Sequence, residues 1–206
     1  MFSALLFITL FTLTFSADSE DCFIVNQNGN YQIEGTTLTI IGKGEMCECT
    51  GKVITFEPSI QIETLIVQNT VTRIGSQCFS KMSTLSSITF NEGLKEIGKG
   101  AFYGISLVNL QLPESITKIE EKAFEQCRQL EKLEITPNSE MIIGDYAFRK
   151  CIKLSSFSVP TNLKTFNGKI IEGCVGLQSI QVDSDNKYFY SVDNLIITKE
   201  GKELVY

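Results

Sequence analysis

The chain has 206 residues, 43% of them apolar, which is enough to bury a substantial core in one compact or one elongated domain. Eighteen Lys and Arg residues stand against 24 Asp and Glu residues without a long basic run, so nucleic acid is not an expected partner. The sequence contains no His, which excludes Ser–His and Cys–His catalysis and His-ligated metal sites and so removes most hydrolase mechanisms. We expect neither an enzyme nor a cofactor; the rival, a thiol-dependent enzyme, is disfavoured by the absence of His and the expected burial of the repeat cysteines.

The first segment of the chain is apolar. MFSALLFITLFTLTFSADSEDC carries no charged side chain before Asp18, and its apolar run from Leu5 to Phe15 has the length of a signal-peptide core. A membrane span needs about 20 apolar residues. We therefore predict a signal peptide at residues 1–16, cleaved after Ser16, and a secreted or cell-surface protein with no membrane span beyond it. A buried core helix or an uncleaved anchor is the alternative.

Residues 17–61 precede a run of internal repeats and are predicted to form an N-terminal cap with lead-in strands. This segment contains Cys22, Cys47 and Cys49. Because a small cap has little core of its own and secreted proteins form disulfides, we expect Cys22 to pair with either Cys47 or Cys49. A metal site at Cys47 and Cys49 is disfavoured because their spacing does not match that of zinc sites.

Residues 62–182 contain a repeat of 22–24 residues, which lies in the range of leucine-rich repeats. In each copy an apolar residue is followed, five positions later, by Phe or Ile, and then by a Leu-x-x-Ile-x-Ile element. A half copy and five copies share this pattern: Ile62-Leu65-Val67, Ile74-Phe79-Leu85-Ile88-Phe90, Ile97-Phe102-Leu107-Leu110-Leu112, Ile119-Phe124-Leu130-Leu133-Ile135, Ile143-Phe148-Leu154-Phe157-Val159 and Phe166-Ile171-Leu177-Ile180-Val182.

The Leu-x-x-Ile-x-Ile element ends in apolar and polar alternation, which predicts a short strand with one face inward. One such unit cannot bury its apolar side, so the copies must stack at about 4.8 Å per coil. The sequence therefore predicts a mostly β solenoid with little helix, in which the Phe lies opposite the strand and a second short extended or 3₁₀ piece completes each coil. Gly75, Gly98 and Gly144 follow the first Ile and are expected at positive φ, as is Asn167. Glu120 departs from this pattern.

The residues that flank the inner Ile of each strand must point outward. They form two columns on one sheet: Thr64 and Ile66, Ser87 and Thr89, Asn109 and Gln111, Lys132 and Glu134, Ser156 and Ser158, Ser179 and Gln181. Most are small or uncharged polar residues, which suits weak, repeated contacts better than one tight hot spot. We predict that this face binds the ligand. The alternative is that these residues only keep the sheet soluble.

Three cysteines, Cys127, Cys151 and Cys174, each lie three positions after the Phe position, where the first two copies have Met and Ile. Such a column predicts buried thiols that behave as small hydrophobic side chains. The alternative is a disulfide between adjacent coils, since a spacing of about 4.8 Å falls within the Cα–Cα range of disulfides. Cys78, which replaces a small Ala of its column, is also expected to be a buried thiol.

Residues 183–206 are predicted to close the solenoid. The segment DSDN, from Asp183 to Asn186, has a faint similarity to a calcium loop but lacks the Gly and the distal Glu, so a solvated turn is predicted. NLIITKEGKELVY is predicted to form a hairpin around Glu200 and Gly201 that covers the last coil.

The repeated segments VTRIGSQCF, LKEIGKGAFYG, ITKIEEKAFEQC and IIGDYAFRKC resemble the BspA-like leucine-rich repeat family, and the similarity covers about residues 36–206. The resemblance implies a right-handed coil with a parallel β-sheet. It also implies a secreted or surface-displayed antigen of the kind that bacteria and protist parasites use in adhesion. The expected partner is an extracellular protein or glycan, such as a host matrix or cell-surface protein. A coat or matrix component without a specific ligand is the alternative.

Overall fold

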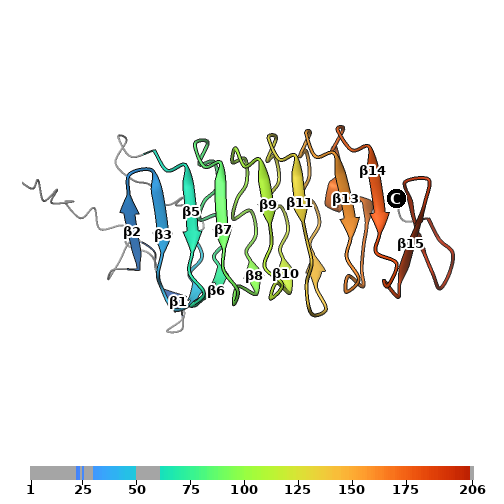
Figure 1. Ribbon diagram of the computed structural model, residues 1–206, viewed down its shortest axis with the longest axis horizontal. Coiled ribbons are helices and arrows are strands. Elements are labelled where there is room, and N and C mark those ends of the chain that lie inside the picture. Colours follow the sequence, from blue (N-terminus) through green and yellow to red (C-terminus); the bar gives the residue numbers. More distant parts are fainter. Residues whose placement is uncertain (1–21, 24, 26–29, 50–60, 205–206) are drawn as a thin grey trace, which may run out of the picture.

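The computed structural model describes residues 22–23, 25, 30–49 and 61–204, and the predicted signal peptide at residues 1–16 lies outside them. The chain forms an elongated stack of coils that runs from the N-terminal to the C-terminal strands (Figure 1). Within this part of the chain, no helix has the length and apolar character needed to cross a membrane.

One row of strands, the front sheet, is formed by the Leu-x-x-Ile-x-Ile elements (Figure 1). Its strands in chain order are β5 (Thr64–Val67), β7 (Ser87–Phe90), β9 (Asn109–Gln111), β11 (Lys132–Glu134), β13 (Ser156–Val159) and β14 (Ser179–Val182). The hydrogen-bonded pairs β5–β7, β9–β11 and β13–β14 are all parallel. At the N-terminal end β3 (Thr37–Ile40) pairs with β5 in parallel, and β2 (Tyr31–Glu34) pairs with β3 in antiparallel orientation.

The second sheet has six parallel strands and contains the first Ile of four repeats. Its strands are β1 (Cys22–Phe23), β4 (Gly44–Met46), β6 (Val71–Ile74), β8 (Glu96–Ile97), β10 (Lys118–Ile119) and β12 (Ile142–Ile143). Ile74, Ile97, Ile119 and Ile143 are all buried. The predicted second piece of each coil is therefore extended in these repeats, and the predicted parallel, mostly β solenoid is confirmed.

The third side of each coil, which we call the turn side, comprises residues 76–84, 99–106, 121–129, 145–153 and 168–176. In the first four copies the residues two before and two after the Phe have positive φ, although six of these eight residues are not Gly. The Phe itself donates its N–H to the next coil, as in the bond from Phe79 to the Ala101 carbonyl at 2.9 Å. The fifth copy has a 3₁₀ helix, η1 (Gly168–Ile171), capped by Asn167. A third row of hydrogen bonds thus joins the coils.

The core follows from this arrangement. Phe79, Phe102, Phe124 and Phe148 are fully buried and form a stack, with neighbouring ring centroids 5.2–5.5 Å apart. Each such aromatic pair stabilises the fold by about 0.5–1.5 kcal/mol beyond the burial of its area. The position predicted to lie opposite the strand is therefore an unbroken aromatic column through four coils.

The expected positive φ at Gly75, Gly98 and Gly144 is wrong, because none of the three lies in the left-handed region. These glycines are required for a different reason, which is the close approach of the preceding coil. A Cβ at Gly98 would lie 2.7 Å from the backbone nitrogen of Ser76. A Cβ at Gly144 would lie 2.6 Å from the backbone nitrogen of Glu121. Asn167 is also extended, with φ −138°.

An antiparallel hairpin of β15 (Phe189–Val192) and β16 (Leu195–Thr198) follows the last coil. Its turn is formed by Asp193 and Asn194, both at positive φ. The turn that was predicted around Glu200 and Gly201 follows it, closed by a bond from the Thr198 N–H to the Glu203 carbonyl and by an antiparallel bridge between Ile197 and Leu204.

Side chains of this hairpin form hydrogen bonds with the backbone groups at the outer edge of β14. The backbone N–H of Ile180 donates to Asn194 Oδ1, and that of Val182 donates to Ser191 Oγ, both at 3.1 Å. Asn194 Nδ2 in turn donates to the Gln178 carbonyl at 3.1 Å. The hairpin therefore supplies from side chains the partners that another strand would have supplied from its backbone.

Asn186 shows that the solvated-turn interpretation of DSDN is only partly right. Asp183 and Asp185 are exposed, but Asn186 is 0% exposed. Its Nδ2 donates to the carbonyls of Pro160 and Leu163 at 2.8 and 3.1 Å. Its Oδ1 accepts from the N–H groups of two residues at the start of the hairpin, Tyr188 and Phe189. One buried amide thus ties the hairpin to the last coil.

Candidate functional site

The front sheet places the predicted ligand-binding residues on one outward face. The backbone register aligns them between hydrogen-bonded strands as Thr64 with Ser87, Ile66 with Thr89, Asn109 with Lys132, Gln111 with Glu134, Ser156 with Ser179, and Ser158 with Gln181. All twelve are exposed or half-buried. Four of the residues between them are buried, namely Leu65, Leu110, Phe157 and Ile180, and the other two, Ile88 and Leu133, are half-buried and pack against the core. The alternation therefore produces the two expected columns.

A groove of about 310 Å³ lies at the carboxyl ends of β7 and β9. Thr89 and Gln111 of the predicted face line it, together with three further polar residues, Glu92, Glu114 and Thr136. These three residues lie outside the strands, where the alternation of inward and outward side chains does not extend, so the predicted face does not include them. Each lies one or two positions after the Leu-x-x-Ile-x-Ile element. Because the ends of stacked parallel strands meet at one edge of a sheet, this spacing predicts that the three residues gather at the carboxyl edge of the front sheet.

The carboxylate of Glu92 bridges two coils beside this groove. It accepts hydrogen bonds from the backbone N–H groups of Glu114 and Ser115 at 3.2 and 3.3 Å. Ser115 Oγ also accepts from the N–H of Gly93 at 3.1 Å. The rim of the groove is thereby fixed by bonds between coils, while the exposed Glu114 side chain leaves a negative charge at its edge.

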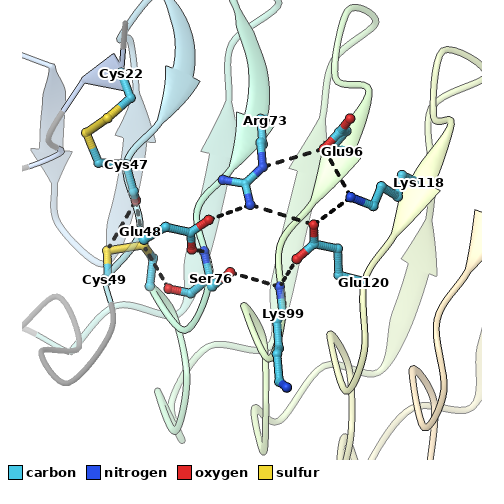
Figure 2. A network of polar contacts seen from close by, with 11 residues as sticks. Cys22, Cys47, Glu48, Cys49, Arg73, Ser76, Glu96, Lys99, Lys118 and Glu120 are labelled. Carbon is cyan, nitrogen blue, oxygen red and sulfur yellow. Dashed lines mark hydrogen bonds and ion pairs between the residues drawn. A yellow bond between two sulfur atoms is a disulfide. The ribbon is translucent and has the colours of Figure 1, made fainter. Parts of the chain in front are cut away.

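The outer face of the second sheet carries a charged network over four successive coils (Figure 2). Arg73, whose side chain is 15% exposed, lies among three carboxylates: Glu48 at 2.5 Å, Glu96 at 3.6 Å and Glu120 at 3.8 Å. Lys118 contacts Glu120 at 2.8 Å and Glu96 at 3.8 Å. Opposite charges alternate along the sheet, and all of these pairs except Lys118–Glu120 join different coils, so the network stabilises the stacking of the coils.

Glu120, which departs from the glycine pattern of the repeat, belongs to this network. Besides its contacts with Arg73 and Lys118, it accepts the backbone N–H of Lys99 at 2.9 Å (Figure 2). That N–H also lies 3.1 Å from Ser76 Oγ. The carboxylate therefore satisfies a backbone donor of the preceding coil and two cations.

The network shifts the pKa values of its members. Partial burial alone raises the pKa of Glu48, but hydrogen bonds from Ser76 and Arg73 outweigh burial and hold this pKa below its usual 4.5. Burial alone lowers the pKa of Arg73, but the Glu48 hydrogen bond and the surrounding carboxylates outweigh burial, so the pKa of Arg73 lies above its usual value. The hydrogen bond with Glu120 raises the pKa of Lys118. All three groups are therefore held in their charged forms.

Two disulfides hold the N-terminal end of the stack. Cys22 pairs with Cys47, one of the two partners expected for it, at a Cα–Cα distance of 5.1 Å. Cys49 pairs with Cys78 at 4.8 Å. The expectation that Cys78 is a thiol was wrong, because Cys49 lies against the first full coil at the distance that a disulfide requires.

Cys127, Cys151 and Cys174 are buried thiols, as predicted. Each S–H lies within hydrogen-bonding distance of the carbonyl of the Phe in the preceding coil, at 3.0–3.4 Å. Burial raises the pKa of Cys127 to about 12, which makes this thiol a poor nucleophile. No group of three or more His, Cys, Asp or Glu side chains in the described ranges is arranged to hold a metal ion.

The stacked coils of about 23 residues, each with one short strand in a continuous row, define a leucine-rich repeat solenoid. The sequence matches the BspA type leucine-rich repeat region in six copies, over residues 52–178 and 135–194. The chain therefore belongs to the BspA type leucine-rich repeat family. No curated protein matches it.

Two solved structures share the fold. The pneumococcal vaccine antigen PcpA superposes with a TM-score of 0.67 at 19% identity, over 87% of this chain and 55% of PcpA. A leucine-rich repeat protein of Eubacterium ventriosum superposes with a TM-score of 0.65 at 21% identity, over 84% of this chain and 47% of that protein. The chain thus spans about half the length of these two proteins.

Proposed function

We propose that this protein is secreted or displayed at the cell surface, where its front face binds an extracellular protein or glycan. The observation that carries the proposal is the outward face itself, on which hydrogen-bonding side chains stand in two aligned columns beside a polar groove. The apolar start of the sequence and the description of PcpA as a vaccine antigen support an extracellular location.

The proposed mode of binding is a sum of weak contacts. Thr, Ser, Asn and Gln side chains donate and accept hydrogen bonds, and Lys132 and Glu134 add one charge of each sign. The twelve residues of the face include no Trp, Tyr or Arg, the residues that dominate tight hot spots. Affinity for a cell or a matrix therefore arises from several repeats or several copies acting together.

The test replaces Asn109, Gln111, Lys132 and Glu134 with Ala and measures adhesion to host cells and to immobilised matrix. Circular dichroism verifies that the solenoid persists. The matched control replaces the same residue types at exposed positions away from the front face: Asn138, Gln61, Lys95 and Glu45. We expect adhesion to fall only in the front-face variant. Unchanged adhesion by that folded variant would contradict the proposal.

Two further measurements test location and class. N-terminal sequencing of the protein purified from its own cells should return a chain that begins near Ala17, and a chain that begins at Met1 would oppose secretion through a cleaved signal. Analytical ultracentrifugation should show a monomer at micromolar concentration. Self-association into large species without a ligand would favour the alternative, a coat or matrix component.

A further inference from the structure

The charged residues of this acidic protein are divided unevenly among its sides. The turn side contains eight Lys or Arg residues and four Asp or Glu residues, a net charge of +4. The remainder of the chain contains ten Lys or Arg residues and 20 Asp or Glu residues, a net charge of −10. The stacking of the coils thus produces a basic surface on a protein whose overall net charge is −6.

Ion pairs within the turn side use its four carboxylates. Glu121 pairs with Lys99 and Lys122, Asp145 with Lys169, and Glu125 and Glu172 both with Arg149. These pairs neutralise one cation in each of the second to fifth coils. The excess positive charge is therefore carried by the basic residues that remain.

Three of these remaining cations have no carboxylate partner among the described residues. The side chains of Lys81 and Lys150 make no hydrogen bond or ion pair within that part of the chain, and Arg128 donates only to Gln126 Oε1 at 3.2 Å. Lys81 and Arg128 are exposed, and Lys150 is half-buried. Lys81 and Lys150 occupy the same position of coils three apart, so their backbones lie about 14 Å from each other along the solenoid.

The groups between and around these cations are polar and uncharged. Gln77, Ser83 and Gln129 are exposed, and Gln126 Nε2 donates to Tyr103 Oη at 2.5 Å. Gly104, in the same column as Lys81 and Lys150, has open space where a side chain would be. The surface therefore presents separated cations, amides and hydroxyls along a shallow line.

We infer that the turn side binds an anionic polysaccharide, whose sulfate or carboxylate groups contact Lys81, Arg128 and Lys150 while its hydroxyls contact the amides between them. An extended chain with a charge on many of its units fits cations spread over four coils. An acidic polypeptide fits less well, because protein interfaces have an apolar centre. On the turn side, within the described residues, the exposed large apolar side chains are Ile152 and Val175, in the last two coils.

This site does not depend on the front face, because the two sets of side chains lie on different sides of the coil. At physiological ionic strength charges more than about 8 Å apart are largely screened. The local excess of positive charge on the turn side can therefore attract an anion despite the net negative charge of the whole chain.

The test measures binding of the full chain to immobilised heparin at 0.15 M salt, with neutral dextran as the blank and hyaluronan as a probe that carries carboxylates but no sulfates. The variant K81Q/R128Q/K150Q removes the three unpaired cations. The matched control K43Q/K95Q/K187Q removes three exposed lysines from other sides and changes the net charge equally. We expect the first variant to weaken heparin binding by about 3- to 150-fold, since each exposed ion pair contributes modestly, and the control to weaken it much less.

Four outcomes would overturn the inference: no binding of the unaltered protein to heparin or hyaluronan, equal losses in both triple variants, no loss in the first variant, or equally tight binding of poly-glutamate. The alanine variant of Asn109, Gln111, Lys132 and Glu134, which leaves the net charge unchanged, should retain heparin binding. Loss of adhesion in that variant with heparin binding intact would separate the two sites.

Discussion

The approach of neighbouring coils at Gly98 gives a stability prediction of defined size. A Cβ at this position would lie 2.7–2.9 Å from backbone atoms of Ile74, Gly75 and Ser76, where ordinary contacts are 3.4–4 Å. Gly98→Ala must therefore separate two backbones by several tenths of an ångström. Such overpacking costs about 1–3 kcal/mol, and the smaller entropy of the unfolded Ala chain offsets about 0.4–1 kcal/mol of it. We expect a net loss of roughly 0–2.6 kcal/mol, centred near 1.3 kcal/mol, which corresponds to a fall in Tm of roughly 3–5 °C at the central value.

Gly104 is the matched comparison, because it has φ +70° and no atom within 4 Å of a built Cβ. Gly104→Ala is also expected to cost about 1–2 kcal/mol, but through backbone conformation alone. Asn tolerates positive φ better than Ala, so Gly104→Asn should recover part of the loss and Gly98→Asn should recover none. Thermal unfolding followed by circular dichroism measures the four variants. Recovery by Asn at residue 98 would refute the close-approach argument.

Three further outcomes are expected. Asn186→Ala should lower the free energy of unfolding by about 3 kcal/mol, because it leaves buried backbone groups without partners; Ser184→Ala, at an exposed position, should change it by less than about 0.5 kcal/mol in the same urea titration. Glu48→Gln should destabilise the protein at neutral pH, and the difference from the unaltered chain should shrink as pH falls below 4.5, because the folded pKa of Glu48 lies below that value and its contribution is lost on protonation; a difference that stays constant down to pH 3 would contradict this. Cys151→Ala should cost on the order of 1 kcal/mol, and mass mapping under oxidising conditions should find Cys151 unpaired rather than joined to an adjacent coil.

The solenoid and its core were predictable because the same apolar pattern occurs in five copies. Stacking places equivalent residues of successive copies against one another. The position of a residue in a copy that departs from the pattern can therefore be inferred from the other copies. Ile171, for example, takes the Phe position of the fifth copy and is fully buried there. The outward columns were predictable for the same reason, since alternation within each strand fixes which side chains face inward. Their role in binding and the boundaries at residues 61 and 182 stay predictions.

Features that depend on contact between unlike segments were not predictable. Cys49–Cys78 joins the cap to the first full coil, and the register of that contact follows from no repeat. The burial of Asn186 depends on carbonyls of Pro160 and Leu163, which lie in the preceding coil. The repeated glycines are a further example. A Gly at a fixed position of a repeat, such as Gly75, is required either by a positive φ or by the close approach of another backbone. The sequence does not distinguish these two causes, and only the position of the neighbouring backbone does.

The division of charge between the sides of the coil is a property of the same kind. Lys81, Arg128 and Lys150 lie 47 and 22 residues apart in the sequence, and each has at least one carboxylate within the same repeat. Stacking places some of those carboxylates on the second sheet, where Glu96 and Glu120 pair with Arg73 and Lys118. The carboxylates that lie on the turn side, such as Glu121 and Asp145, pair with other cations there and leave these three without a carboxylate partner among the described residues. A repeat protein that binds through one face can therefore carry a second, basic surface without a change to its core, because the side chains of the two surfaces occupy different positions of the same 22–24-residue unit.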